Sequence, residues 1–219
     1  MSEPVKRRPY HSTLRAEQAR ATRARILDSA RTLFAAHGYH GTTLEDVGRD
    51  AGVAADTVLH SFGSKKGLLR AVLDVEVGGD DAQIRVLDRE GPQAMRSETD
   101  QRRQVEMFAA GITGQLERIR PLDDILRSAA AVDPDARSLR DDLQLRQRKA
   151  AMREIAGWIA ANGPLRDDIT VDDAAAMLWT LTSPEVHELL RDRCGWDSDR
   201  YRRWLAQTLG DSIVGPNRP

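Results

Sequence analysis

The chain has 219 residues and carries 33 Lys and Arg against 34 Asp and Glu, which gives a formal net charge of −1. This length allows one large or two small domains with a substantial apolar core. The single cysteine, Cys194, excludes an intrachain disulfide and favours a reducing compartment. No apolar run approaches the roughly 18 residues of a membrane span, and the N-terminus lacks a signal-peptide core. We therefore expect a cytoplasmic protein that does not contact membranes.

The charge is unevenly distributed along the chain. Residues 1–74 carry 12 Lys and Arg against 8 Asp and Glu, whereas the remainder carries 21 against 26. A basic N-terminal part and an acidic remainder are typical of a DNA-binding head on a body that avoids DNA. Residues 1–16 contain Pro4 and Pro9 and no apolar periodicity, which predicts a flexible basic arm. Such an arm either reaches the minor groove or phosphates beside the main site, or remains a solvated tail.

Residues 42–69 contain the pattern of two short helices around a tight glycine turn. Thr43 precedes an apolar-periodic run and Asp46 follows three residues later, which is typical of a helix start. Gly52 ends this helix with the residue type that tolerates a left-handed turn. A second short helix is predicted over 54–61, with one apolar face directed inward. This arrangement fits a helix-turn-helix, although an ordinary helical hairpin in a bundle is an alternative.

The second helix is small and polar, which suits a helix that enters a major groove. Its candidate DNA-contacting residues are Ala54, Ala55, Asp56, Thr57, His60 and Ser61.

The flanking segments extend this unit on both sides. Residues 22–33 form an amphipathic helix that is predicted to stop near Gly38. On the other side, Ser64 can cap a further helix and Lys65 lies in its first turn. A cation there is unfavourable for the helix dipole unless it meets a phosphate together with the exposed amides.

Together, these positions resemble the N-terminal domain of the TetR family of bacterial transcriptional regulators. The matching residues are Thr22, Ile26, Leu27, Ala30, Leu33, Phe34, Gly38, Tyr39, Thr42, Thr43, Val47, Ala51, Gly52, Val53, Thr57, His60, Phe62, Ser64, Lys65, Leu68 and Leu69. The resemblance implies that Thr43, His60 and Lys65 contact the DNA backbone, while residues 54–61 read bases. It also implies a homodimer on a palindromic operator, in a family with more repressors than activators.

Two residues depart from the family pattern. Leu59 occupies a position where the family usually has tyrosine, often a phosphate contact. Asp56 stands where a small residue is favoured, and its charge would lie near phosphates unless it accepts a hydrogen bond from a cytosine amino group. These residues support an alternative function, an all-helical protein-interaction module that keeps the three-helix head as scaffold.

Helical patterning continues through the rest of the chain, so the predicted fold class is all-α. We expect a three-helix helix-turn-helix head at 17–64 and a helical ligand-binding and dimerisation domain at 65–214. Helices are predicted over approximately 65–76, 97–119, 121–131, 136–161, 171–181, 185–194 and 198–213. Residues 78–95 are expected to form the longest irregular segment, because Gly78, Gly79, Gly91 and Pro92 interrupt the helical pattern.

Two sets of apolar residues in the second domain are candidates for functional sites, an effector pocket and a dimer interface. By the family resemblance, a small and apolar effector would bind among Phe108, Ile112, Ile125, Leu126, Met152, Trp158 and Met177. The final helices would form the dimer interface through Trp196, Tyr201, Trp204, Leu205 and Leu209. For both sets, a role in the core of a single chain is the alternative.

The sequence offers no motif for an enzyme or a cofactor. It contains neither a glycine-rich phosphate loop nor a nucleophile elbow. The histidines and Cys194 lack the spacing of metal ligands, so no metal is expected.

Overall fold

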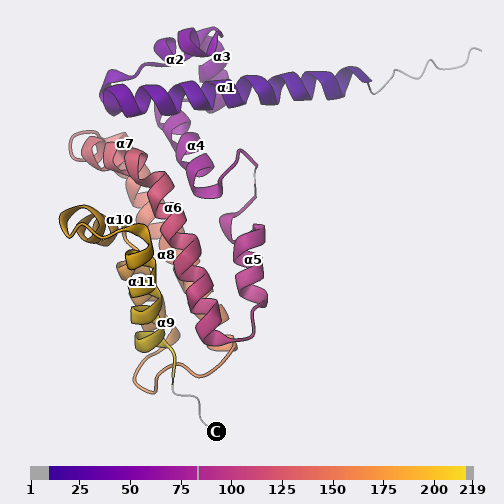
Figure 1. Ribbon diagram of the computed structural model, residues 1–219. Helices are drawn as coiled ribbons and strands as arrows, with labels where there is room; N and C mark the ends of the chain where they lie inside the picture. The colour runs from indigo at the N-terminus through magenta and orange to yellow at the C-terminus, as the bar shows by residue number, and fades with distance from the viewer. Residues whose placement is uncertain (1–9, 83, 216–219) are drawn as a thin grey trace, which may run out of the picture. The chain divides into compact units, whose positions relative to one another are not determined.

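The computed structural model describes residues 10–82 and 84–215, whose regular elements are helices apart from one isolated antiparallel bridge between Leu165 and Val214 (Figure 1). This confirms the all-α prediction. The chain divides into two compact units, Met1–Val72 and Leu73–Pro219. The boundary expected from the sequence, between 64 and 65, coincides with the start of helix α4 (Lys65–Gly78), which instead runs from the first unit into the second.

The first unit consists of α1 (Tyr10–Gly41), α2 (Leu44–Ala51), α3 (Ala55–Phe62) and the first turns of α4. α1 contains a non-helical residue at Gly38 (φ 68°, ψ −177°), so the regular helix is interrupted where the sequence predicted its end. Its beginning differs from the prediction. Residues 10–16, assigned to a flexible arm, form the start of α1, because a segment without proline can extend a helix that is already held by its apolar face. The rest of the expected arm, residues 1–9, lies outside the described residues.

The helices of the first unit enclose a small apolar core. α1 packs against α2, and α2 against α3 (Figure 1). The core side chains are almost fully buried: Ile26, Leu27, Ala30, Phe34, Tyr39, Val47, Ala51, Val58, Leu68, Leu69 and Val72. The Arg23 guanidinium also lies 4.5 Å from the centre of the Phe62 ring, a cation–π contact between α1 and the end of α3.

The second unit is a bundle in which α6 packs against α11 and α8 against α9 (Figure 1). After α4, its elements are η1 (Val86–Asp88), α5 (Glu90–Ser97), α6 (Gln101–Ala130), α7 (Pro134–Asp141), η2 (Asp142–Arg148), α8 (Lys149–Ala161), α9 (Val171–Leu181), α10 (Pro184–Glu188), η3 (Leu189–Arg193) and α11 (Ser198–Ile213). η1 is a 3₁₀ turn, and η2 and η3 are π-helical. No helix of the described residues is long and apolar enough to cross a membrane.

Proline positions explain two differences from the predicted helices. Pro121 was expected to begin a new helix but lies inside the continuous α6. It removes one helix hydrogen bond, at a cost of about 3 kcal/mol, yet Leu116 and Leu122 on either side are buried and hold the helix in place. Pro92 was expected in an irregular segment but lies in the first turn of α5, where the missing N–H would have no intrahelical partner.

Helix ends in the second unit follow their capping residues closely. α11 has the predicted bounds, Ser198–Ile213, and the carboxylate of Asp197 accepts from the Arg200 amide (2.7 Å). α9 begins with a reciprocal capping box between Thr170 and Asp173. The predicted helix at 136–161 is continuous from α7 to α8, with the π-helical η2 inserted between them.

Candidate DNA interface

Thr43 forms the N-cap of α2, as the sequence predicted. Its hydroxyl accepts from the Asp46 amide (3.1 Å) and donates to the Asp46 carboxylate (2.7 Å). This hydrogen bond from Thr43 is the largest cause that lowers the pKa of Asp46 below its ordinary value. Thr43 is exposed, so a phosphate that bound its hydroxyl would compete with Asp46 for the same proton.

The turn between α2 and α3 depends on two glycines. Gly52 has φ 68° and ψ 38°, the left-handed conformation expected of a glycine that ends a helix. Gly48 is buried inside α2, and a Cβ at this position would lie 2.9 Å from the Val53 carbonyl oxygen. The Val53 amide donates to the Gly48 carbonyl (2.8 Å), which closes the turn. No local sequence pattern marks Gly48, because only the close approach of two backbone segments makes glycine necessary there.

α3 presents a polar face to solvent and an apolar face to the core. Val58 is fully buried, whereas Asp56, Thr57, His60 and Ser61 are exposed. Ala54 is the exposed N-cap, with no capping side chain, and Ala55 is half-buried. The Ser61 hydroxyl donates to the Thr57 carbonyl (2.8 Å), which leaves its oxygen free to accept. The predicted base-reading residues therefore lie together on one short helix, with the shape that a major groove admits.

The two departures from the family pattern are both exposed on α3. Leu59 is 47% exposed, a large apolar side chain in contact with solvent beside polar neighbours. Asp56 is exposed in the first turn of α3, where its charge suits the helix dipole.

The start of α4 lies directly after the end of α3. Ser64 caps α4 by accepting from the Gly67 amide (3.0 Å). A Cβ at Gly67 would lie 2.1 Å from the Phe62 carbonyl oxygen, so glycine permits this close junction. The Lys65 ammonium lies 4.4 Å from the centre of the Tyr39 ring. The ring face therefore stabilises this cation of the first turn of α4 within the chain.

The second unit packs most of the expected pocket residues into its core. Phe108, Ile112 and Met152 belong to one buried apolar cluster, and Trp158 and Met177 pack against it. Leu126 is buried farther along α6, and its neighbour Ile125 is half-buried. Most of these residues therefore pack in the core of the chain, which was the alternative to a pocket role. Their part in binding an effector stays a prediction.

The expected dimer interface divides into two groups. Tyr201, Leu205 and Leu209 are fully buried in the core of their own chain, so they offer no surface to a partner. The periodicity of α11 could not separate these two roles, because a core face and an interface face have the same spacing. Trp196 and Trp204 are half-buried and pack edge to face, with ring centres 5.8 Å apart. Only these two keep exposed surface for an interface.

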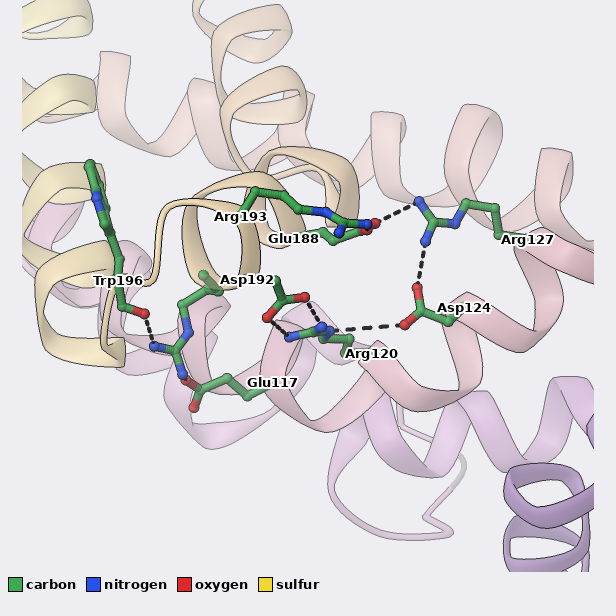
Figure 2. A network of polar contacts seen from close by, with 9 residues as sticks. Glu117, Arg120, Asp124, Arg127, Glu188, Asp192, Arg193 and Trp196 are labelled. Carbon is green, nitrogen blue, oxygen red and sulfur yellow. Dashed lines mark hydrogen bonds and ion pairs between the residues drawn. The ribbon is translucent and has the colours of Figure 1, made fainter.

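A network of ion pairs connects α6 to α10 and η3 (Figure 2). Arg127 pairs with Asp124 on α6 (2.7 Å) and with Glu188 at the end of α10 (2.8 Å). Arg120 pairs with Asp192 and Arg193 with Glu188, as Figure 2 shows. Arg191 of η3 pairs with Glu117 of α6 (3.3 Å) and donates to the Trp196 carbonyl (2.5 Å). No local sequence pattern predicts this network, because most of its partners lie far apart in the chain. It orients α10 and η3 against α6, although each exposed pair contributes only about 0.2–1 kcal/mol.

The described residues contain no group of three or more His, Cys, Asp or Glu side chains arranged to hold a metal ion.

Comparisons with known proteins agree with the helix-turn-helix geometry. Residues 26–72, from α1 to the middle of α4, match the sequence profile of the bacterial regulatory proteins of the tetR family. This match identifies residues 26–72 as a TetR-type DNA-binding head. Its match to the HTH-type transcriptional regulator AlkX of Mycobacterium tuberculosis is 42% identical over 66 residues, or 30% of this chain and 29% of AlkX. The transcriptional repressor ComR of Escherichia coli is 48% identical over 48 residues, or 22% of this chain and 23% of ComR. The matches therefore span less than a third of the length of these curated relatives and concern the head.

Solved structures share the fold over nearly the whole chain. NalD of Pseudomonas aeruginosa, described as the secondary repressor of a multidrug efflux pump, superposes with a TM-score of 0.66 at 22% identity. That match covers 88% of this chain and 95% of NalD. FadR of Bacillus subtilis, crystallised with stearoyl-CoA, superposes with a TM-score of 0.62 at 16% identity and covers 87% of this chain and 98% of that chain. At these identities the resemblance concerns the fold alone.

Proposed function

We propose that this protein is a homodimeric transcriptional regulator that represses its target genes by binding a palindromic operator. The observation that carries the proposal is the outward face of α3, where Asp56, Thr57, His60 and Ser61 are exposed while Val58 anchors the helix in the core. A helix of eight residues with this surface is suited to reading base edges in a major groove.

Lys65 and the start of α4 supply the complementary electrostatic contact. The ammonium is positioned over the Tyr39 ring, and Lys65 is the first residue of α4, whose first amides have no intrahelical partner. An anion at this point would satisfy both the amides and the cation. With Thr43 at the start of α2 and His60 on α3, the head has three candidate backbone contacts per subunit, and a dimer doubles them.

We further propose that a small-molecule effector bound in the second unit modulates operator binding. The support is the apolar core cluster that contains Phe108, Ile112 and Met152, in the unit that does not carry α3. NalD and FadR, which have the same fold, are described respectively as a repressor and as a complex with stearoyl-CoA.

The test begins with selection of bound DNA from a random duplex pool by the full-length chain, followed by mobility-shift titrations of the selected site at several salt concentrations. We expect a palindromic site and an affinity that falls steeply with salt. Equal, salt-insensitive binding to every duplex would exclude this function.

Lys65→Ala separates backbone contacts from base reading. Losing one phosphate contact should weaken binding to all sequences alike and reduce the salt slope by about 1, whereas Thr57→Ala should change sequence preference. Arg202→Ala, which removes an exposed cation of α11, is the charge-matched control and should leave both quantities unchanged. An effect of Lys65→Ala no larger than that of Arg202→Ala would contradict the assigned role of Lys65.

A protein-interaction module is the second candidate, and the exposed Leu59 favours it. In that case, the selected pool would show no enriched sequence, and Leu59→Ala would leave DNA binding unchanged.

A further inference from the structure

Arg148, the last residue of η2, has an incompletely satisfied guanidinium inside the second unit. Its Nη2 donates to the Trp179 carbonyl (2.5 Å) and to the Thr182 hydroxyl (2.7 Å). Its Nε and Nη1 are shielded from solvent and have no hydrogen-bond partner among the described residues. A guanidinium has five donors and no acceptor, so only an acceptor can satisfy these two nitrogens. A cation that is shielded from solvent and lacks hydrogen-bond partners destabilises the fold, so its presence calls for a functional explanation.

The acidic groups near Arg148 are already bonded elsewhere. Asp123 accepts from the Gln144 side chain (3.3 Å), and Glu185 accepts from Arg140 (2.5 Å). The Tyr201 hydroxyl donates to the Leu181 carbonyl (3.4 Å). Burial lowers the pKa of Arg148 to about 10, against the opposing effect of Glu185, Tyr201 and Asp123, so the side chain stays cationic at neutral pH. The unmet requirement at this position is therefore for an anionic acceptor.

Arg148 also lies close to the apolar core of the second unit. Met152 lies four residues farther along the same helix and is buried in the cluster that contains Phe108 and Ile112. Residues four apart share a helix face, so the cation lies at the edge of the apolar core. Arg148 also belongs to a π-helical segment, a rare conformation that occurs frequently at functional sites.

We propose that the second unit binds a small organic acid whose anionic oxygen group accepts from Nε and Nη1 of Arg148 and whose hydrocarbon part packs toward Met152. This inference rests on the proposed function, because the acid would be the effector. It changes the expected effector from a purely apolar molecule to an amphipathic anion. Its entry requires the side chains that now cover Nε and Nη1 to move aside.

The test is calorimetric titration of the full-length chain, without DNA, with octanoate and with octanamide, its neutral analogue of nearly equal size. Tryptophan fluorescence gives a second signal, because the Arg148 guanidinium lies 5.7 Å from the centre of the Trp179 ring. We expect octanoate to bind at least about tenfold more tightly than octanamide. Equal affinity for the two, or no octanoate binding up to about 1 mM, would overturn the proposal.

Arg148→Met removes the cation and keeps an apolar side chain of similar length, a change that cores often accept. It should raise the Kd for octanoate at least about tenfold. Arg146→Met is the matched control, since Arg146 lies on the same segment and its side chain is 78% exposed. It should leave octanoate binding unchanged. Retained octanoate affinity in Arg148→Met would assign Arg148 a purely structural role, and melting curves followed by circular dichroism verify that each variant is folded.

Measuring acid binding without DNA keeps the two proposals separable. A chain that binds the selected operator but does not prefer octanoate would overturn only the acid site. A chain that prefers octanoate but binds no DNA would overturn the proposed function and leave the acid site in place.

Discussion

Gly48 illustrates how one missing side chain shapes the DNA-binding head. α2 and the turn before α3 approach so closely that the Val53 amide bonds the Gly48 carbonyl at 2.8 Å. A methyl group at residue 48 would meet backbone atoms of Val53 and Ala55, which cannot rotate aside. The orientation of α3 relative to α2 therefore depends on glycine at this position.

Gly48→Ala should lower the free energy of unfolding of the head by about 1–3 kcal/mol, because the added methyl forces the two helices apart. Urea unfolding followed by circular dichroism measures the change. Gly111→Ala is the control, since nothing lies within 4 Å of a Cβ there. It should instead stabilise α6 by up to about 1 kcal/mol. A Gly48→Ala chain as stable as the wild type would show that the turn relaxes without cost.

At the scale of elements, the second unit buries two titratable side chains where its helices meet. Asp123 on α6 and His187 on α10 are 4% and 2% exposed. Burial is the largest cause of both pKa shifts. It raises the pKa of Asp123 to about 6, and it lowers the pKa of His187 to about 4 with the help of Arg191 and Arg120. In the folded protein each residue is therefore neutral over a wider pH range than in the unfolded chain.

These two residues should give opposite contributions to stability between about pH 4 and pH 6. The folded state keeps the Asp123 proton that the unfolded state loses above pH 3.8, so this contribution falls as the pH rises. The unfolded state binds a His187 proton below pH 6.5 that the folded state does not, so this contribution rises with pH. Each amounts to at most about 3 kcal/mol.

Urea unfolding of the full chain from about pH 4 to pH 7 tests this balance. Asp123→Asn removes the falling contribution, so stability should rise with pH more steeply than in the wild type. His187→Phe removes the contribution that rises with pH, so the free energy of unfolding should decline as the pH increases over the same range. Wild-type pH dependence in both variants would mean that neither side chain is buried in its neutral form.

At the scale of the whole molecule, three of the five residues expected at the dimer interface lie in the core of a single subunit. Tyr201, Leu205 and Leu209 stabilise a single subunit, while Trp196 and Trp204 keep exposed surface. The Arg200 guanidinium lies 4.5 Å from the centre of the Trp196 ring, which leaves a half-buried aromatic beside a cation. Aromatic and arginine side chains of this kind are enriched in interface cores.

Sedimentation equilibrium should give a mass twice the 24.4 kDa of one chain. Trp196→Ala should raise the dimer dissociation constant at least about tenfold, because large aromatics carry much of the binding free energy of an interface. Val132→Ser, at a side chain that is 75% exposed between α6 and α7, is the control and should not change the dissociation constant. A monomeric wild type, or equal weakening by both substitutions, would refute this assignment.

The sequence by itself determined the helical class, the three-helix head and many helix ends. The reason is that these features depend on neighbouring residues: Thr43 and Ser64 cap helices through groups three residues away, and Gly52 needs only its own conformation. The exposed residues of α3 were equally accessible to prediction, since one face of an amphipathic helix fixes the other.

Only the tertiary structure decided which apolar residues of α11 lie in the core, how Pro121 is accommodated within α6, and where Arg148 is enclosed. Each of these outcomes depends on contacts between segments far apart in the chain, such as Arg148 with Thr182. Local periodicity is the same for a helix face that meets its own chain and for one that meets a partner, so it cannot distinguish them. The packing of distant segments determines which face of α11 lies in the core. The same packing shields the Arg148 nitrogens to which we assign an acidic effector.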